Sequence, residues 1–200
     1  MNLQVLKDNI AGVDIYILDQ ILKDRYQKND KILDVGCGNG RNLKWFYNAG
    51  FEIHGVDKEK VKLDYCKELY PLQKEHFILA TAEKLPYNSN MFNHIICNAV
   101  LHFADDLNLY LKMFSELLRV LKPEGTLFIR MASNFGIETQ VIHDCNGVYN
   151  LPDGSQRFLL TDNILDMHKS NQHIIFLEPV KTTVVEDKRS MTTLVLKKIH

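Results

Sequence analysis

The stretch KILDVGCGNGRN (residues 31–42) decides the fold. Its first five residues, KILDV, predict a buried strand, and three glycines follow at positions 36, 38 and 40. The next run, RNLKWFYNAG (41–50), has the pattern of a helix that ends at Gly50. Glycine lets the backbone turn sharply and lets a ligand approach within contact distance. Free N–H groups at the helix start favour a polar or anionic ligand group, so we expect a ligand-binding turn here.

Short apolar runs alternate with amphipathic stretches on both sides of this loop, a pattern typical of a parallel sheet wrapped by helices. We expect further strands at 52–56, 76–80, 92–98 and 126–132, and further helices at 14–26, 57–70 and 105–121. Two late runs, 173–179 and 190–198, have no helix between them and should pair antiparallel. LPDGS (151–155) predicts a hairpin turn, and 161–170 predicts a short helix capped by Thr161 or Asp162.

Composition excludes several classes of protein. The 200 residues suit one domain over 1–200, with 133–160 as a hairpin insertion on the substrate side. Lys and Arg number 24 against 25 Asp and Glu, and no basic stripe is visible, so we expect no nucleic-acid partner. No apolar run reaches the ~18 residues of a membrane span, and the polar start is unlike a signal peptide, which favours the cytoplasm. Neither CxxC nor HxxxH spacing occurs, so no metal site is predicted.

The spacing of the glycines identifies the ligand more closely. The dinucleotide fingerprint is GxGxxG/A, whereas this loop reads GxGxG and has Arg41 where a small residue is needed. GxGxG with Asp34 two places before the first glycine resembles motif I of the class I S-adenosylmethionine-dependent methyltransferases. DVGCGNGRN is especially similar to the tellurite-resistance-type methyltransferases. The resemblance implies a Rossmann-like α/β fold, a seven-stranded sheet that is mostly parallel with an antiparallel last strand, and helices on both faces.

The resemblance also implies a set of cofactor contacts. Asp57 ends the second strand, where a carboxylate can accept hydrogen bonds from both ribose hydroxyls and can at the same time cap the next helix. Thr81 stands where the family has an acid that contacts the adenine amino group. The expected residues are Asp34, Gly36, Cys37, Gly38, Asn39, Gly40, Asn42, Asp57, Lys58, Thr81, Ala82, Glu83, Asn98 and Ala99. They would bind S-adenosylmethionine and its product S-adenosylhomocysteine.

Four further side chains are candidates for the reaction itself. His102 follows the fourth strand and would face the cleft as a general base, or else serve as polar lining. Arg130 leaves the fifth strand and would hold an anionic group of the substrate, or else form an ion pair that covers the sheet end. Tyr149 and Arg157, in the hairpin, are substrate candidates of the same kind. Asn93 replaces an acid that is usual in the family, a change we interpret as structural.

The sequence therefore predicts methyl transfer to a small-molecule acceptor by in-line displacement, catalysed by a monomer or homodimer. The Asn/Asp-Pro-Pro-aromatic run of amino methyltransferases is missing after the fourth strand, and so is the Pro-Cys pair of C5-cytosine enzymes. Two alternatives remain open. One is a methyltransferase-like protein that binds cofactor without turnover, which Thr81 and Asn93 would allow. The other is an NAD-dependent oxidoreductase, which Arg41 disfavours.

Overall fold

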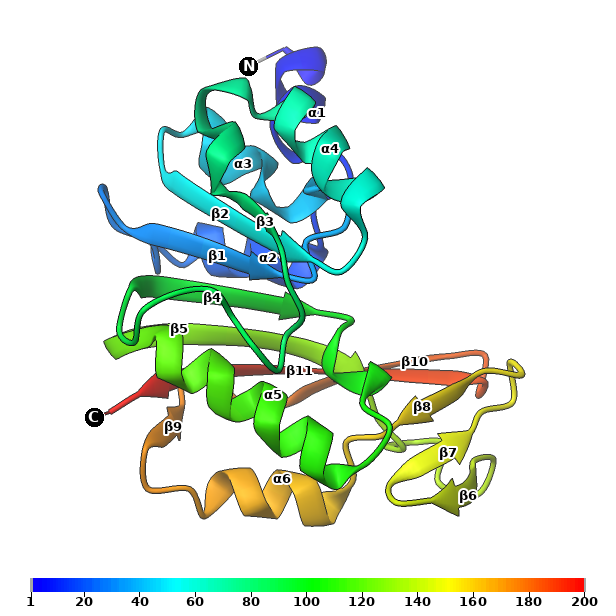
Figure 1. Cartoon of the computed structure of the whole chain (residues 1–200). Helices are drawn as coiled ribbons and strands as arrows, with labels where there is room; N and C mark the ends of the chain where they lie inside the picture. Colours follow the sequence, from blue (N-terminus) through cyan, green and yellow to red (C-terminus); the bar gives the residue numbers. More distant parts are fainter. Residues whose placement is uncertain (1, 200) are drawn as a thin grey trace.

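The central sheet orders its strands around the predicted glycine loop. The computed structural model describes residues 2–199. Five strands run parallel: β1 (Lys31–Val35), β2 (Glu52–Asp57), β3 (Phe77–Leu79), β4 (Phe92–Asn98) and β5 (Leu121–Ala132). The order β3-β2-β1-β4-β5-β11-β10 places β1 centrally, and the chain reverses direction of crossover there (Figure 1). In such open sheets, ligands bind outside the carboxyl ends of the strands at this switch point.

The last strands form the predicted antiparallel return. β11 (Arg189–Lys198) pairs antiparallel with β5, and its other edge carries β9 (Ile174–Phe176) and β10 (Lys181–Val185). The pairing expected between 173–179 and 190–198 is confirmed, with Phe176 opposite Leu196. β10 was not expected. Since β9 and β10 share one edge of β11, the eight strands occupy seven positions in the sheet. The predicted Rossmann-like α/β fold is confirmed.

Helices cover both faces of the sheet because its strands carry apolar side chains on both faces. In β5, Phe128 packs on one face with α2 (Ile15–Leu22), α3 (Lys44–Asn48) and α4 (Lys60–Leu69). Its neighbours Leu127 and Ile129 pack on the other face with α5 (Leu107–Val120) and α6 (Asp162–Lys169). Buried side chains thus alternate between the two layers with the period of two that a strand imposes.

Several helices differ from their predicted bounds. The helix expected at 14–26 ends at Leu22, and α1 (Leu3–Ile10), which buries no residue, was not predicted. The helix expected at 41–50 is a 3₁₀ turn (Arg41–Leu43) followed by α3, and the helix expected at 57–70 begins at Lys60. Two more 3₁₀ turns, Pro71–His76 and Leu101–Phe103, precede β3 and α5. Thr161 occupies the N-cap of α6 without a side-chain cap hydrogen bond.

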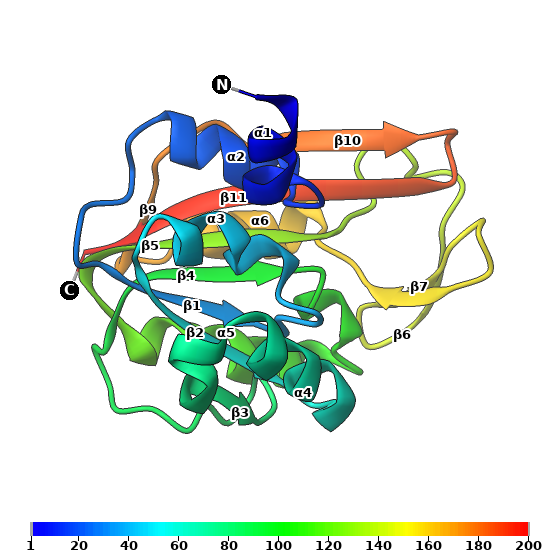
Figure 2. The ribbon, with the colours of Figure 1, turned by 90° about the horizontal axis from the view of Figure 1, so that it is seen from above.

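A small three-stranded sheet follows β5 and lies beyond the carboxyl ends of β4 and β5 (Figures 1 and 2). It consists of β6 (Ile142–Cys145), β7 (Val148–Asn150) and β8 (Gln156–Phe158), all antiparallel. The predicted LPDGS hairpin joins β7 to β8, and the Leu151 N–H donates to the Ser155 carbonyl at 2.9 Å. Phe158 stacks on Tyr110 of α5 with ring centroids 4.8 Å apart, which fixes this sheet to the main core.

Two sequence expectations stay predictions. The single domain over 1–200 is one, and its end residues 1 and 200 lie outside the described part of the chain. The cytoplasmic location is the other. Within residues 2–199, no helix combines the length and the apolar character that crossing a membrane requires.

Candidate active site

The glycine loop adopts a backbone that other residues rarely take. Gly36, Gly38 and Gly40 have φ of 68°, 53° and 73°, all left-handed. A Cβ on Gly36 would lie 2.3 Å from Val100 Cγ2, so the segment after β4 packs directly on the loop. A Cβ on Gly38 would meet nothing within 4 Å. The loop is therefore packed on the Gly36 side and open on the Gly38 side, where a ligand can approach the backbone.

Asp57, at the end of β2, holds this loop in place. One of its carboxylate oxygens accepts the Gly38 N–H at 2.8 Å, and the other accepts the Glu59 N–H at 2.9 Å. The loop is also fixed by the N–H groups of Gly36 and Cys37, which donate to the Val56 carbonyl at 2.8 and 2.9 Å. Asp57 thus supports the turn that precedes α4, but the N-cap of α4 is Glu59, so the expectation that Asp57 itself caps this helix is wrong. Its contact with the ribose stays a prediction.

Asp34 carries a buried carboxyl group, one oxygen of which lacks a hydrogen-bond partner in the described chain. Its residue is 1% exposed, and its Oδ2 has no hydrogen-bond partner within residues 2–199. Burial raises the pKa of Asp34 to about 8; Arg41 opposes this shift and the charge of Asp57 adds to it. Arg41 itself donates to the Gly12 carbonyl at 2.9 Å and makes no hydrogen bond to Asp34. An unsatisfied carboxyl group beside an open glycine loop fits a ligand that brings hydrogen-bond donors or positive charge.

Asp14 joins the N-terminal segment to the ends of three other elements. It accepts the Asn98 side-chain amide of β4 at 3.1 Å and lies 3.6 Å from the Arg130 guanidinium of β5. Its own N–H donates to Asn42, beside the glycine loop, at 3.1 Å. The Asn98 Oδ1 and the Arg130 Nε are buried and have no partner in the described chain. The Arg130–Asp14 ion pair is the alternative role considered for Arg130. The Asn98 Oδ1 and the Arg130 Nε each remain free to form a hydrogen bond with a ligand.

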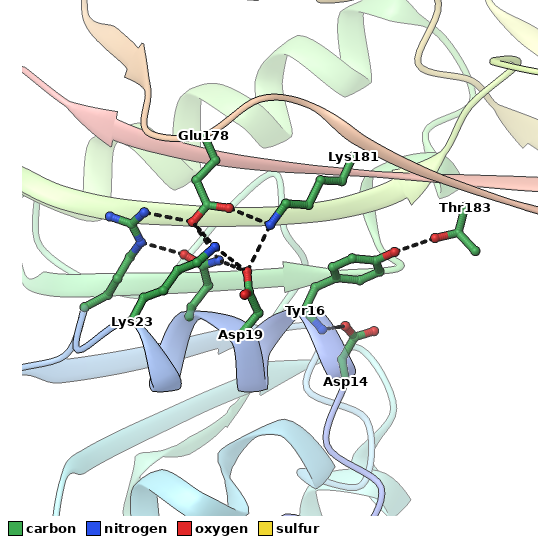
Figure 3. A network of polar contacts seen from close by, with 9 residues as sticks. Asp14, Tyr16, Asp19, Lys23, Glu178, Lys181 and Thr183 are labelled. Atoms are coloured by element: carbon green, nitrogen blue, oxygen red, sulfur yellow. Dashed lines mark hydrogen bonds and ion pairs between the residues drawn. The ribbon is translucent and has the colours of Figure 1, made fainter.

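Sequence reasoning missed Asp14, which it placed inside a helix. Asp14 is the N-cap of α2 and accepts the Tyr16 N–H at 2.9 Å. The Tyr16 hydroxyl shares a 2.6 Å hydrogen bond with Thr183 of β10, so α2 lies against the edge of the sheet (Figures 2 and 3). An Asp before an apolar helical run signals a cap, but no local pattern signals contacts to residues 42, 98 and 130.

An ion cluster fastens the other end of α2 (Figure 3). Glu178, between β9 and β10, accepts hydrogen bonds from Lys23, Arg25 and Lys181 at 2.7–2.8 Å, and Lys181 also contacts Asp19 at 3.0 Å. Burial opposes ionisation of Glu178, but the hydrogen bonds from these cations outweigh it and hold its pKa well below the usual range. The cluster keeps α2, and therefore Asp14, in position beside the candidate site.

His102 lies after β4 as predicted, with its Nδ1 already engaged. The buried Ala132 N–H donates to Nδ1 at 3.1 Å, so the ring proton of the neutral imidazole is on Nε2. Burial lowers the pKa of His102 to about 4, and the charges of Arg157 and Arg189 add to the shift. In this arrangement His102 can donate a hydrogen bond from Nε2, but the Nδ1 lone pair that could accept a proton is occupied by the Ala132 N–H. Its catalytic role stays a prediction, and the geometry favours a donor over a base.

The remaining candidates follow the strand ends. Ala99 has φ of 62°, an uncommon conformation that places its N–H on the Arg130 carbonyl at 2.7 Å. After β3, Thr81 is exposed and bridges Lys84, whereas Ala82 is buried and Glu83 half-buried. The other expected contacts also lie on the loops: Asn39 and Lys58 are exposed, and Cys37 and Asn42 are buried. Asn93 accepts from Lys31 N–H and Lys122 Nζ, which agrees with its structural interpretation.

One titratable cluster lies away from these loops. Glu52 and His54 of β2 approach His76, with 3.0 Å between His54 Nε2 and Glu52 Oε1. The two imidazole rings stack with centroids 4.2 Å apart and planes 3° from parallel. Because a metal ion lies in the plane of each imidazole that binds it, two parallel stacked rings cannot share one ion without rotating. The cluster therefore gives no reason to revise the expectation of no metal.

Comparison with known proteins identifies the family. The family model for a methyltransferase domain matches residues 33–129, from β1 to β5. A ubiquinone biosynthesis O-methyltransferase of Bartonella tribocorum is 31% identical over 104 residues, which cover 50% of this chain and 40% of the relative. Residues 33–129 form a methyltransferase domain of the S-adenosylmethionine-dependent type. The matched stretch includes the glycine loop, Asp57 and the segment after β4.

Other methyltransferases extend the comparison. A tRNA (carboxymethyluridine(34)-5-O)-methyltransferase of Arabidopsis thaliana is 34% identical over 98 residues, 49% of this chain and 23% of the relative. A solved structure of a S-adenosylmethionine-dependent methyltransferase from Methanosarcina mazei has a TM-score of 0.73 and 19% identity, covering 90% of this chain and 97% of the other. That likeness shows the fold. The chain spans between 24% and 40% of the length of the first curated relatives it matches.

The methyltransferase match supports S-adenosylmethionine as the cofactor and gives no support to an NAD-dependent enzyme. S-adenosylmethionine is the cofactor of the family, and the unpartnered Asp34 beside the open face of Gly38 fits a cofactor with an amino group and a sulfonium charge. Neither the family model nor these relatives favour an NAD-dependent oxidoreductase.

Proposed function

We propose that this methyltransferase transfers the methyl group of S-adenosylmethionine to a small-molecule acceptor at the carboxyl edge of its sheet. The observation that carries the proposal is the glycine loop, open at Gly38, held by Asp57 and backed by the unpartnered carboxyl group of Asp34. Polar groups buried without a partner are rare in native proteins. Three such groups, Asp34, Asn98 and Arg130, lie near the carboxyl ends of β1, β4 and β5, where open sheets of this type bind ligands.

The chain's own residues would then bind and orient. Asp57 would accept the ribose hydroxyls in addition to the Gly38 N–H, and Asp34 would face the positive end of the cofactor. Asn98, held by Asp14, would present its free Oδ1 to the methionine part. The other expected residues would complete the cofactor site: Gly36, Cys37, Gly38, Asn39, Gly40, Asn42, Lys58, Thr81, Ala82, Glu83 and Ala99. His102 would donate from Nε2 toward the acceptor, and Arg130, Tyr149 and Arg157 would contact it.

The proposed chemistry needs little from the protein beyond placement. S-adenosylmethionine, when bound, would supply an electrophilic methyl group. A lone pair of the acceptor would bond to the methyl carbon as the methyl–sulfur bond on the opposite side breaks, which leaves S-adenosylhomocysteine. Proximity, alignment and exclusion of water supply several kcal/mol in reactions of this type. A small-molecule acceptor is supported by the net charge of −1 and by the ubiquinone biosynthesis relative, while the tRNA relative makes RNA the competing acceptor.

The experiment is a calorimetric titration of the purified protein with S-adenosylhomocysteine, with NADH as the matched control. We expect S-adenosylhomocysteine alone to bind, at roughly micromolar Kd. Failure of S-adenosylhomocysteine to bind a protein that is folded by circular dichroism would refute the proposal. Transfer of labelled methyl groups to pools of small molecules and of tRNA then separates an enzyme for small molecules from an RNA methyltransferase, and from a protein that only binds cofactor.

A further inference from the structure

A row of aromatic and cationic side chains crosses the small sheet and continues onto the main domain. His143 of β6 lies opposite Tyr149 of β7, and Tyr149 lies opposite Arg157 of β8, so the three share one face. The rings of His143 and Tyr149 are 4.9 Å apart. Phe158, next to Arg157 in the strand, points to the opposite face and is buried in the core. The polar face is therefore presented away from the core, on the side of Phe103.

Phe103 continues this row beside the cofactor loops. The Arg157 guanidinium lies 4.8 Å from the centroid of the Phe103 ring, and the Lys58 Nζ lies 6.0 Å from it. Phe103 follows His102, and Lys58 follows Asp57. Lys58, which also lines the proposed cofactor site, therefore joins the row to that site. Phe103 is 54% exposed although the cationic groups of Arg157 and Lys58 both lie within 6.0 Å of its ring centroid. We call His143, Tyr149, Arg157, Phe103 and Lys58 the cationic row.

The charges of the cationic row are uncompensated. Within residues 2–199, neither Lys58 nor Arg157 has a carboxylate within ion-pair distance, although many other lysines and arginines of the chain do. Arg157 donates one N–H to the Gln156 carbonyl. A guanidinium that lies over a ring keeps its edge free, and the remaining N–H groups can bind a carboxylate or a phosphate. The Phe103 ring offers a flat apolar surface at the same place.

We propose, resting on the methyl transfer proposed above, that the cationic row binds the acceptor, and that the acceptor is a small planar molecule carrying a carboxylate or phosphate group. Arg157 and Lys58 bind the anionic group, and Phe103 packs against the planar part. The position of the row fixes the acceptor beside the segment that runs from Asn98 to Phe103, whose Val100 contacts Gly36 of the cofactor loop. The row thus selects the acceptor, and the glycine loop selects the donor.

Three fluorinated probes of one shape test this assignment by fluorine NMR titration: 4-fluorobenzoate, 4-fluorophenyl phosphate and the uncharged 4-fluorobenzamide. Each is added to the wild-type protein with and without saturating S-adenosylhomocysteine. We expect at least one anion to bind about tenfold more tightly than the amide, since a charge-assisted contact is worth about that factor. The tighter anion tells whether a carboxylate or a phosphate group is preferred.

Matched variants assign the binding to the row. Arg157→Gln should weaken the preferred anion about tenfold and leave the amide unchanged, while Phe103→Ala should weaken anion and amide alike. Lys74→Gln makes the same charge change at an exposed residue before β3 and should have no effect. Equal binding of the amide and both anions, or equal affinities in Arg157→Gln and Lys74→Gln, would overturn the inference. Binding of S-adenosylhomocysteine, measured separately, tests the proposed function and not the row.

Discussion

The Asp57 carboxylate accepts the Gly38 N–H at 2.8 Å, so the end of β2 directly holds the loop that follows β1. The two strands are parallel neighbours, with Val35 opposite Val56, and their loops leave the sheet side by side. A ribose bound by Asp57 would therefore lie next to the most open glycine of the loop. The same carboxylate would then hold the loop and bind the ligand, which would couple the order of the loop to the affinity for cofactor.

Asp57→Ala should weaken binding of S-adenosylhomocysteine by ~1.5–3 kcal/mol, the loss expected for charge-assisted hydrogen bonds. Asp57→Asn keeps an oxygen acceptor without the charge, so its affinity for S-adenosylhomocysteine should lie between those of the wild type and Asp57→Ala. Asp64→Ala is the control, because the Asp64 side chain on α4 is 47% exposed and pairs with Lys60. Calorimetry measures the affinities, and thermal melts check folding. An affinity within about twofold of the wild type would remove Asp57 from the site.

The strands of the core could be predicted closely from the sequence. β1 and β4 begin and end at the predicted residues, because strands buried on both faces read as continuous apolar runs with clear ends. α1 and β10 were missed for the opposite reason. α1 buries nothing, and β10 is an edge strand whose residues KTTVV are exposed or half-buried. Such elements take their conformation from partners distant in sequence, which local patterns do not record.

The candidate site divides in the same way. The glycine loop and Asp57 could be recognised because their spacing lies within 24 residues of sequence, on consecutive strand ends. The contact of Asp14 with Asn98 spans 84 residues, and its partners are ordinary polar residues in their local context. His102 illustrates a further limit. Its position was predicted, but the Ala132 N–H that occupies its Nδ1 belongs to another strand.

Gly36→Ala should be more damaging than the same change at Gly12. Both glycines have left-handed φ, 68° and 84°, so each variant bears the ~1–2 kcal/mol cost of that conformation. Only at Gly36 does the new methyl group meet Val100, which adds ~1–3 kcal/mol of overpacking. Urea denaturation measures the difference. Val100→Ala in the Gly36→Ala background should recover part of it, and equal losses at Gly12 and Gly36 would contradict the packing.

His102→Ala should lower the free energy of unfolding by ~1–3 kcal/mol, because the buried Ala132 N–H loses its acceptor. His102→Asn places an amide oxygen near the former Nδ1 and should recover part of this loss. The pKa of His102 is lowered to about 4, so its contribution to stability is complete above about pH 6.5 and is lost as the pH falls toward 4. Denaturation curves over this range test both points. An unchanged acid limb in His102→Asn would show that another group causes it.

Glu178→Gln should loosen α2 from the sheet edge. Its side chain is 8% exposed and pairs with Lys23, Arg25 and Lys181. Removing its charge leaves Asp19 as the carboxylate paired with Lys23 and Lys181, and leaves Arg25 without its ion-pair partner. We expect a loss of ~1–3 kcal/mol, below the value for fully buried pairs because the cations are 24–39% exposed. Glu186→Gln, whose side chain is 75% exposed, should cost less than ~0.5 kcal/mol. Similar urea midpoints for both variants would contradict a clamping role.

Asp34 should make the stability of the cofactor-free protein depend on pH. Burial raises its pKa to about 8, whereas an Asp in the unfolded chain titrates near 3.9. Between these values the folded state binds a proton that the unfolded state has lost, so stability falls as the pH rises from about 4 to about 8. Asp34→Asn should remove this slope and leave the protein more stable at pH 8. Denaturation at several pH values measures it.

Cofactor binding should make the Asp34 carboxyl group lose its proton. A positively charged ligand group beside its Oδ2 favours the carboxylate, so at pH 7 binding should release close to one proton, and affinity should rise with pH until about 8. Calorimetry in phosphate and in Tris measures the proton, because the two buffers differ in heat of ionisation. Asp34→Asn should give the same heat in both. The same heat in both buffers for the wild type would show that Asp34 does not ionise when the cofactor binds.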